Sequence, residues 1–84
     1  MTQVITVRYF AGARAAAGMD EQQVPVDRSW PLEKLAGHLS ELHGPALGRV
    51  LAVASFLVDE TAGSRDRIVP AGSVVDVLPP FAGG

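Results

Sequence analysis

The stretch that most constrains the fold is Val74–Leu78, a run of five residues with apolar side chains at four positions. Successive side chains of a strand point to opposite faces of a sheet, so this stretch carries apolar groups on both faces. A strand of that kind belongs in the interior of a sheet, with a neighbour on each side. Pro79 and Pro80 follow at once and must end the strand, because proline has no backbone N–H to donate.

Two further strands are predicted near the start of the chain. The β-branched and aromatic run Val4–Phe10 is typical of a strand, and its more apolar face should meet the core. That face consists of Ile5, Val7 and Tyr9. Glu21–Val26 is predicted as an antiparallel neighbour, confined by Pro25 to a sheet edge or a strand end.

One amphipathic helix stands out, from Pro31 to His43. Its apolar residues recur at three- and four-residue spacing and form a single stripe: Leu32, Leu35, Ala36, Leu39 and Leu42. Gly44-Pro45 ends it. Gly37 inside this helix costs about 1 kcal/mol relative to alanine, and we expect it to let a strand approach closely. A short helical turn is also predicted over Ala11–Gly18.

The second half of the chain is harder to interpret. Val50–Asp59 is nearly all apolar, and its second part favours a buried strand, while its first part fits either a strand or a helical turn. Thr61–Ser64 and Pro70–Ser73 are predicted turns. The charged segment Arg65–Val69 between them is predicted as a short edge strand.

The order of these elements predicts an α+β fold, with one main helix packed on one face of a mixed sheet of four to five strands. If the last strand lies in the interior beside the first, this is the β-grasp, or ubiquitin-like, arrangement. We expect residues 1–78 to form that domain, and residues 79–84 to form an extended tail leaving its most rigid strand.

Composition excludes several classes of function. The chain has 84 residues, which suit one domain, and no cysteine, which rules out disulfides, iron–sulfur clusters and thiol nucleophiles. Its seven basic residues are spread out and the net charge is −2, so no nucleic-acid partner is expected. With no long apolar run and no signal-peptide pattern, we expect a cytoplasmic protein without a membrane partner.

Side chains able to carry chemistry are sparse. His38 and His43 are five residues apart and would point about 140° apart on a helix, so no metal site is predicted. The acidic pairs Asp20-Glu21 and Asp59-Glu60 fall at predicted turns, and no phosphate-binding loop is present. Trp30 is interpreted as a packing residue. We expect a chain that binds no cofactor and is not catalytic alone.

The end of the sequence is the exception. Beyond Phe81 no side chain is larger than a methyl group, so Ala82-Gly83-Gly84 could enter a channel too narrow for ordinary residues. Six residues of polyproline II reach roughly 18 Å, and a closing Gly-Gly arises by chance in roughly one chain in two hundred. With so few other candidates, the sequence suggests that chemistry takes place on this end, inside another protein.

At this point the residues resemble a known family, the MoaD/ThiS sulfur carriers. The opening Val7–Arg14 is similar to that family's start, and Leu57–Asp59 and Ala71–Val74 fall where the family has its hairpin entry and a turn. Leu78–Gly84 most resembles the end of the small subunit of molybdopterin synthase. Asp59 and Ser73 depart from the family's usual Asn and Asp, both at turn positions.

The resemblance implies a mechanism and partners. An E1-like adenylyltransferase would use ATP to adenylate Gly84, a sulfurtransferase donor would convert it to a thiocarboxylate, and the large, catalytic subunit of molybdopterin synthase would receive the tail. The residues expected to bind these partners are Gly83, Ala82, Phe81, Pro80, Pro79, Leu78, Phe10 and Arg14. Three alternatives stay open: sulfur transfer to thiamine, cysteine or tRNA, a ubiquitin-like protein modifier, or a plain interaction module.

Overall fold

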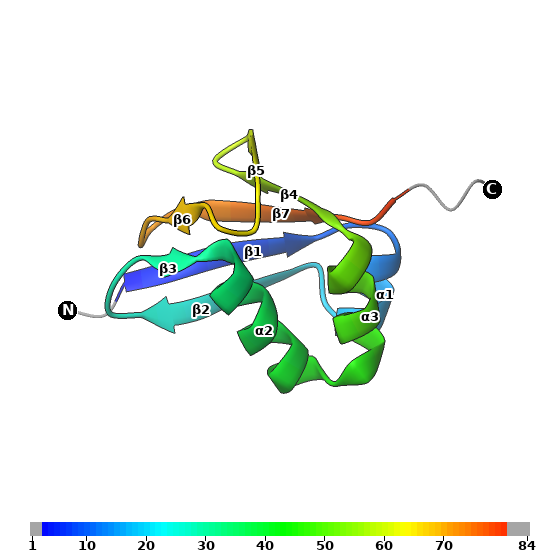
Figure 1. The fold of residues 1–84 in the computed structure, drawn as a ribbon. Helices are drawn as coiled ribbons and strands as arrows, with labels where there is room; N and C mark the ends of the chain where they lie inside the picture. Colours follow the sequence, from blue (N-terminus) through cyan, green and yellow to red (C-terminus); the bar gives the residue numbers. More distant parts are fainter. Residues whose placement is uncertain (1–2, 81–84) are drawn as a thin grey trace.

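A computed structural model describes residues 3–80 of the chain (Figure 1). Five strands form one mixed sheet in the order β2-β1-β7-β4-β5. They are β1 (Gln3–Tyr9), β2 (Glu21–Val26), β4 (Ser55–Val58), β5 (Thr61–Gly63) and β7 (Val74–Leu78). A separate pair joins β3 (Trp30–Pro31) to β6 (Ile68–Val69). The helices are α1 (Gly12–Ala17), α2 (Leu32–His43) and α3 (Pro45–Val53).

The central prediction is confirmed, because β7 lies in the interior of the sheet. It pairs in parallel with β1 and antiparallel with β4. β2 is antiparallel to β1 and occupies an edge of the sheet, which is one of the two positions that Pro25 allowed. The fold is therefore an α+β fold of the β-grasp type.

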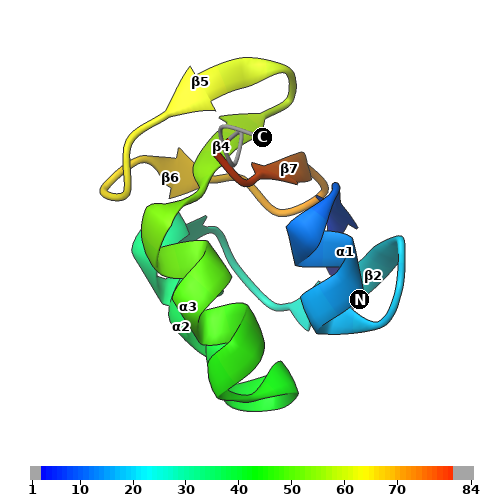
Figure 2. The same cartoon turned by 90° about the vertical axis from the view of Figure 1, so that its right-hand side faces the viewer.

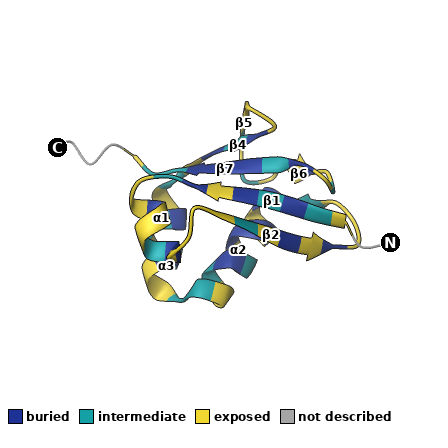
Figure 3. Ribbon diagram, turned by 180° about the vertical axis from the view of Figure 1, so that it is seen from behind, coloured by how far each residue is buried: buried dark blue, intermediate teal, exposed yellow. Residues whose placement is uncertain are grey.

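The core lies between the sheet and the helices, which all sit on the same side of the sheet (Figure 1). Ile5, Val7 and Tyr9 of β1 face it and are buried, as predicted. α2 contributes Leu32, Leu35 and Leu39, and β7 contributes Val75 and Val77. In Figure 3 buried and exposed residues alternate along β1, whereas the middle of β7 is buried throughout.

Beside the predicted main helix α2, the structure has a further helix, α3, that was not predicted at this length. Gly44 ends α2 with φ of 92°, and Pro45 takes the first position of a new helix, where its missing N–H costs nothing. Leu47 and Leu51, four residues apart, are buried on the inner side of α3. The open question about residues 50–54 is thus resolved as helix up to Val53, and the strand begins at Ser55.

Three smaller predictions are wrong. The segment 61–64, expected as a turn, contains strand β5, and the turn lies earlier, at Asp59 and Glu60. The predicted strand of residues 65–69 is reduced to β6, which pairs with β3 and not with the main sheet. At Gly37 no strand approaches, since an added Cβ would meet nothing within 4 Å.

Candidate functional site: an apolar groove at the end of β7

A groove of about 680 Å³ lies where β7 ends and the chain leaves the sheet. In Figure 2 this end of the molecule faces the viewer, with α1 and α3 below the end of β7. Its walls are apolar or backbone throughout: Phe10, Ala11, Gly12, Val50, Val53, Leu78, Pro79 and Pro80. With no titratable side chain in its lining, the groove is suited to binding an apolar surface and not to acid–base chemistry.

Three elements bring these walls together. β1 and β7 run in parallel, so Phe10, which follows β1, and Leu78, the last residue of β7, lie at the same end of these two strands. The chain then turns sharply from β1 into α1 at Ala11, whose φ of 49° is uncommon for a residue with a side chain. Opposite this turn, α3 contributes Val50 and Val53, and Val53 is 64% exposed.

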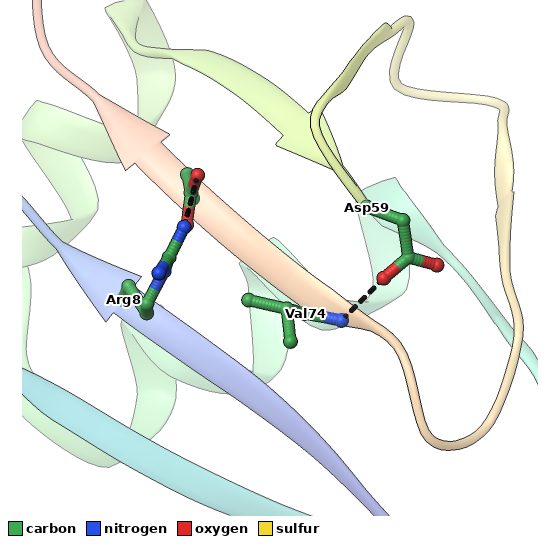
Figure 4. A network of polar contacts seen from close by, with 4 residues as sticks. Arg8, Asp59 and Val74 are labelled. Carbon is green, nitrogen blue, oxygen red and sulfur yellow. Dashed lines mark hydrogen bonds and ion pairs between the residues drawn. The ribbon is translucent and has the colours of Figure 1, made fainter.

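An ion pair joins β1 and β7 just before the groove. Arg8 Nε and Nη2 donate to the two carboxylate oxygens of Asp76 at 2.5 and 2.9 Å (Figure 4). The Asp76 side chain is only 8% exposed, whereas that of Arg8 is 44% exposed. The hydrogen bond to Asp76, followed by the attraction of its charge, raises the pKa of Arg8. The guanidinium also lies 5.9 Å from the centre of the Phe10 ring.

A second polar contact holds the start of β7. Asp59 Oδ1 accepts a hydrogen bond from the backbone N–H of Val74 at 2.9 Å (Figure 4). Asp59 and Glu60 have φ of 48° and 70°, which fits the tight two-residue turn between β4 and β5. These residues and Arg8 surround a smaller hollow of about 320 Å³.

Tyr9, between Arg8 and Phe10, is fixed on the opposite, core side of the sheet. Its hydroxyl donates to Gln22 Oε1 at 2.9 Å, and the same oxygen lies 2.6 Å from His43 Nε2. Burial raises the pKa of Tyr9 to about 12. His43 is thus a structural residue that connects the end of α2 to β2.

The predicted partner-binding residues divide into three groups. Phe10, Leu78, Pro79 and Pro80 are brought together in the groove. Arg14 is not among the groove residues; it lies on α1, where its Nε pairs with Asp20 Oδ1 at 3.0 Å. The remaining candidates lie outside the described residues: Phe81, Ala82, Gly83 and Gly84.

Sequence reasoning missed half of the groove, namely Ala11, Gly12, Val50 and Val53, and also the ion pair beneath it. The signal for α3 was present in Gly44-Pro45 followed by leucines four residues apart. The signal for the ion pair was Asp76 itself, because a carboxylate in an interior strand needs a partner.

Across residues 3–80, no cluster of three or more His, Asp or Glu side chains could hold a metal ion. Within the same range, no helix is long and apolar enough to cross a membrane.

The comparisons with known proteins agree with the fold. The ThiS family model matches residues 7–84. The crystal structure of SAMP1 from Haloferax volcanii is 25% identical, has a TM-score of 0.82, and its match covers 96% of this chain and 99% of that one. No curated protein sequence matches significantly.

Two more distant structures show the same fold. A putative molybdopterin converting factor subunit 1 from Pyrococcus furiosus is 22% identical with a TM-score of 0.77, covering 94% of this chain and 99% of that one. A chain from the complex of subunits 1 and 2 of the molybdopterin-converting factor of Helicobacter pylori is 21% identical with a TM-score of 0.66, covering 96% and 99%. With a family model matching nearly the whole sequence, this chain belongs to the ThiS family of ubiquitin-like sulfur carriers.

Proposed function

We propose that this chain is the sulfur carrier subunit of a molybdopterin synthase. In this proposal Gly84 is the terminal residue, an E1-like enzyme adenylates its carboxylate, and a sulfur donor converts it to a thiocarboxylate. The large synthase subunit then receives the tail and transfers the sulfur to a pterin precursor. The observation that carries the proposal is the apolar groove directly beside the point where an interior strand releases the chain toward Gly83 and Gly84.

The geometry supports a docking role for the groove. Leu78 and Pro79 are half-buried against the sheet and Pro80 is exposed, so the base of the tail is fixed while its direction is set by two prolines. A partner that binds in the groove fixes the base of the tail relative to the partner's own active site, where the carbonyl of Gly84 reacts. Such positioning makes transfer effectively intramolecular.

The chemistry needs a second protein because a carboxylate is a poor electrophile. Adenylation joins the carboxylate to the α-phosphate of ATP and releases pyrophosphate, leaving an acyl group with AMP as a good leaving group. A hydrosulfide equivalent from the sulfur donor then attacks the acyl carbon, the bond to AMP breaks, and the sulfur remains on the backbone terminus as a thiocarboxylate. A chain without cysteine can therefore carry sulfur.

The test is the intact mass of the chain after co-expression with its E1-like enzyme and sulfur donor. We expect the C-terminal peptide to gain about 16 Da, the difference between sulfur and oxygen, by substitution at the acyl carbon. Deleting Gly84 should abolish the gain and leave thermal unfolding unchanged. Sulfur transfer by the Gly84-deleted chain would contradict the proposal. Co-purification of the acceptor subunit separates the molybdopterin pathway from thiamine, cysteine and tRNA thiolation.

A second function, conjugation to other proteins, is favoured by the similarity to SAMP1, since a second structure from Haloferax volcanii is described as small archaeal modifier protein 1. A modifier uses the same activated carbonyl, but an amine of another protein attacks it and forms an amide. This reading predicts a ladder of larger adducts on denaturing gels. A carrier limited to sulfur gives none.

A further inference from the structure

The segment Ser64–Arg67 lies outside the groove yet contacts two of the three helices, α2 and α3. Its backbone caps the start of α2: Leu32 N–H donates to the Arg67 carbonyl and Glu33 N–H to the Arg65 carbonyl, each at 2.8 Å. The N-cap residue of α2 is Pro31, which provides no side-chain cap. This loop therefore supplies acceptors for two N–H groups that a helix leaves unpaired.

The side chain of Arg65 reaches in the other direction, to the end of α3. Its Nη2 donates to the carbonyl oxygens of Leu51 at 2.6 Å and Ala52 at 3.1 Å. The guanidinium also lies 5.2 Å from the centre of the Phe56 ring on β4. One side chain thus ties the last turn of α3 to the sheet.

The last turn of α3 has no cationic side chain of its own to bind its carbonyl groups. No basic residue occurs in its last turn, and Ala54, which follows it, is extended with φ of −76° and ψ of 156°. The final carbonyls of a helix carry partial negative charge, which a cation stabilises. Arg65 provides that cation from a loop fourteen residues later in the chain than Leu51.

The two carbonyls that Arg65 binds lie between two groove residues in the sequence. Val50 precedes Leu51 and Val53 follows Ala52, and both valines form the α3 wall of the groove. A shift or fraying of this last turn would move Val50 and Val53 relative to Leu78. The opposite side of the groove would stay in place, because Phe10 directly follows β1 and Leu78 is the last residue of β7.

We propose that Arg65 is a positioning residue for the docking groove: it holds the last turn of α3, and through it Val50 and Val53, in the arrangement that the activating enzyme binds. This inference rests on the proposed function, since it assigns Arg65 a part in presenting the tail. Arg65 itself is not a groove residue.

The test compares Arg65→Met and Arg65→Lys with Arg49→Met. Arg49 is an exposed arginine on α3, and its side chain makes no hydrogen bond or ion pair within residues 3–80, so it controls for loss of charge. The assay is ATP–pyrophosphate exchange catalysed by the E1-like enzyme with each carrier variant. We expect Arg65→Met to raise KM about five- to tenfold with kcat within about twofold, because binding and not chemistry is affected.

The KM of Arg65→Lys should fall between those of Arg65→Met and Arg49→Met. Lysine keeps the positive charge, but its ammonium group lacks the planar guanidinium that binds both carbonyls. A second measurement reports position directly: the methyl resonances of Val50 and Val53 should shift in Arg65→Met and not in Arg49→Met. Should Arg65→Met fail to give a cooperative unfolding transition, the Arg65→Lys variant carries the same comparison.

Equal KM values for the Arg65 and Arg49 variants would overturn the inference. So would a raised KM with unmoved Val50 and Val53 resonances, because Arg65 would then contact the enzyme itself. If the wild-type chain supports no exchange at all, the proposed function fails, while the resonances still test whether Arg65 positions the groove.

Discussion

At the scale of single residues, Tyr9 gives a direct test of the core. It is 1% exposed, and burial raises its pKa to about 12 from an ordinary value of 10.0, because the phenolate is disfavoured away from water. The folded state therefore holds the phenol proton more tightly than the unfolded chain does. This contribution to stability is complete below pH 10 and is lost as the pH rises from about 10 toward 12.

We predict that the free energy of unfolding falls by about 2–3 kcal/mol over that range because of this group. The chain has a single tyrosine, so the ultraviolet absorbance of tyrosinate reports its titration without ambiguity. Tyr9→Phe is the control, and it should flatten this part of the stability profile. Titration of Tyr9 near pH 10 in a chain that is still folded would contradict the prediction.

At the scale of elements, α2 has one glycine inside it, Gly37, and another just beyond its end, Gly44, and we expect opposite effects from substituting them. Gly37 is exposed within the helix, and a Cβ there would meet nothing within 4 Å. We predict that Gly37→Ala stabilises the protein by about 1 kcal/mol, because alanine restricts the unfolded chain and favours the helix. Urea unfolding measures the change.

Gly44→Ala is the matched control, the same substitution just beyond the end of the same helix. Gly44 has φ of 92°, which a residue with a Cβ adopts only with strain. We expect a loss of about 1–2 kcal/mol. If both substitutions changed stability in the same direction, the account of how α2 ends and α3 begins would be wrong.

At the scale of the whole molecule, the first and last strands of the sheet lie side by side at its centre. β1 and β7 are flanked by β2 on one side and by β4 and β5 on the other. Neither central strand can open without exposing the core residues Val7 and Val77, whereas β5 is short and lies at an edge. The strand that releases the tail is therefore among the most restrained parts of the fold.

We predict that backbone amides of β1 and β7 exchange hydrogen only on global unfolding, and that those of β5 exchange through local opening. Hydrogen exchange followed by NMR, as a function of low urea concentrations, distinguishes the two. Exchange of β7 amides at the rate of β5 amides would show that the tail is attached to a locally mobile strand.

The sequence by itself determined the elements whose patterns are local. β1, β2 and β7 could be predicted because alternation and the prolines at positions 25, 79 and 80 act within a few residues. The interior place of β7 followed from apolar groups on both of its faces. The resemblance of the whole chain to the sulfur carriers agreed with the family match.

Only the tertiary structure decided how the groove is built. Residues 50–53 are apolar enough for a strand or a helix, and their state depends on Gly44, Pro45 and the packing of Leu47 and Leu51 under the sheet. Arg8 and Asp76 are 68 positions apart, and Arg65 lies fourteen from Leu51. Periodicity shows which face of its own element a residue occupies. A groove depends on which elements, distant in the sequence, lie side by side, and that is decided only when β7 pairs with β1 and β4.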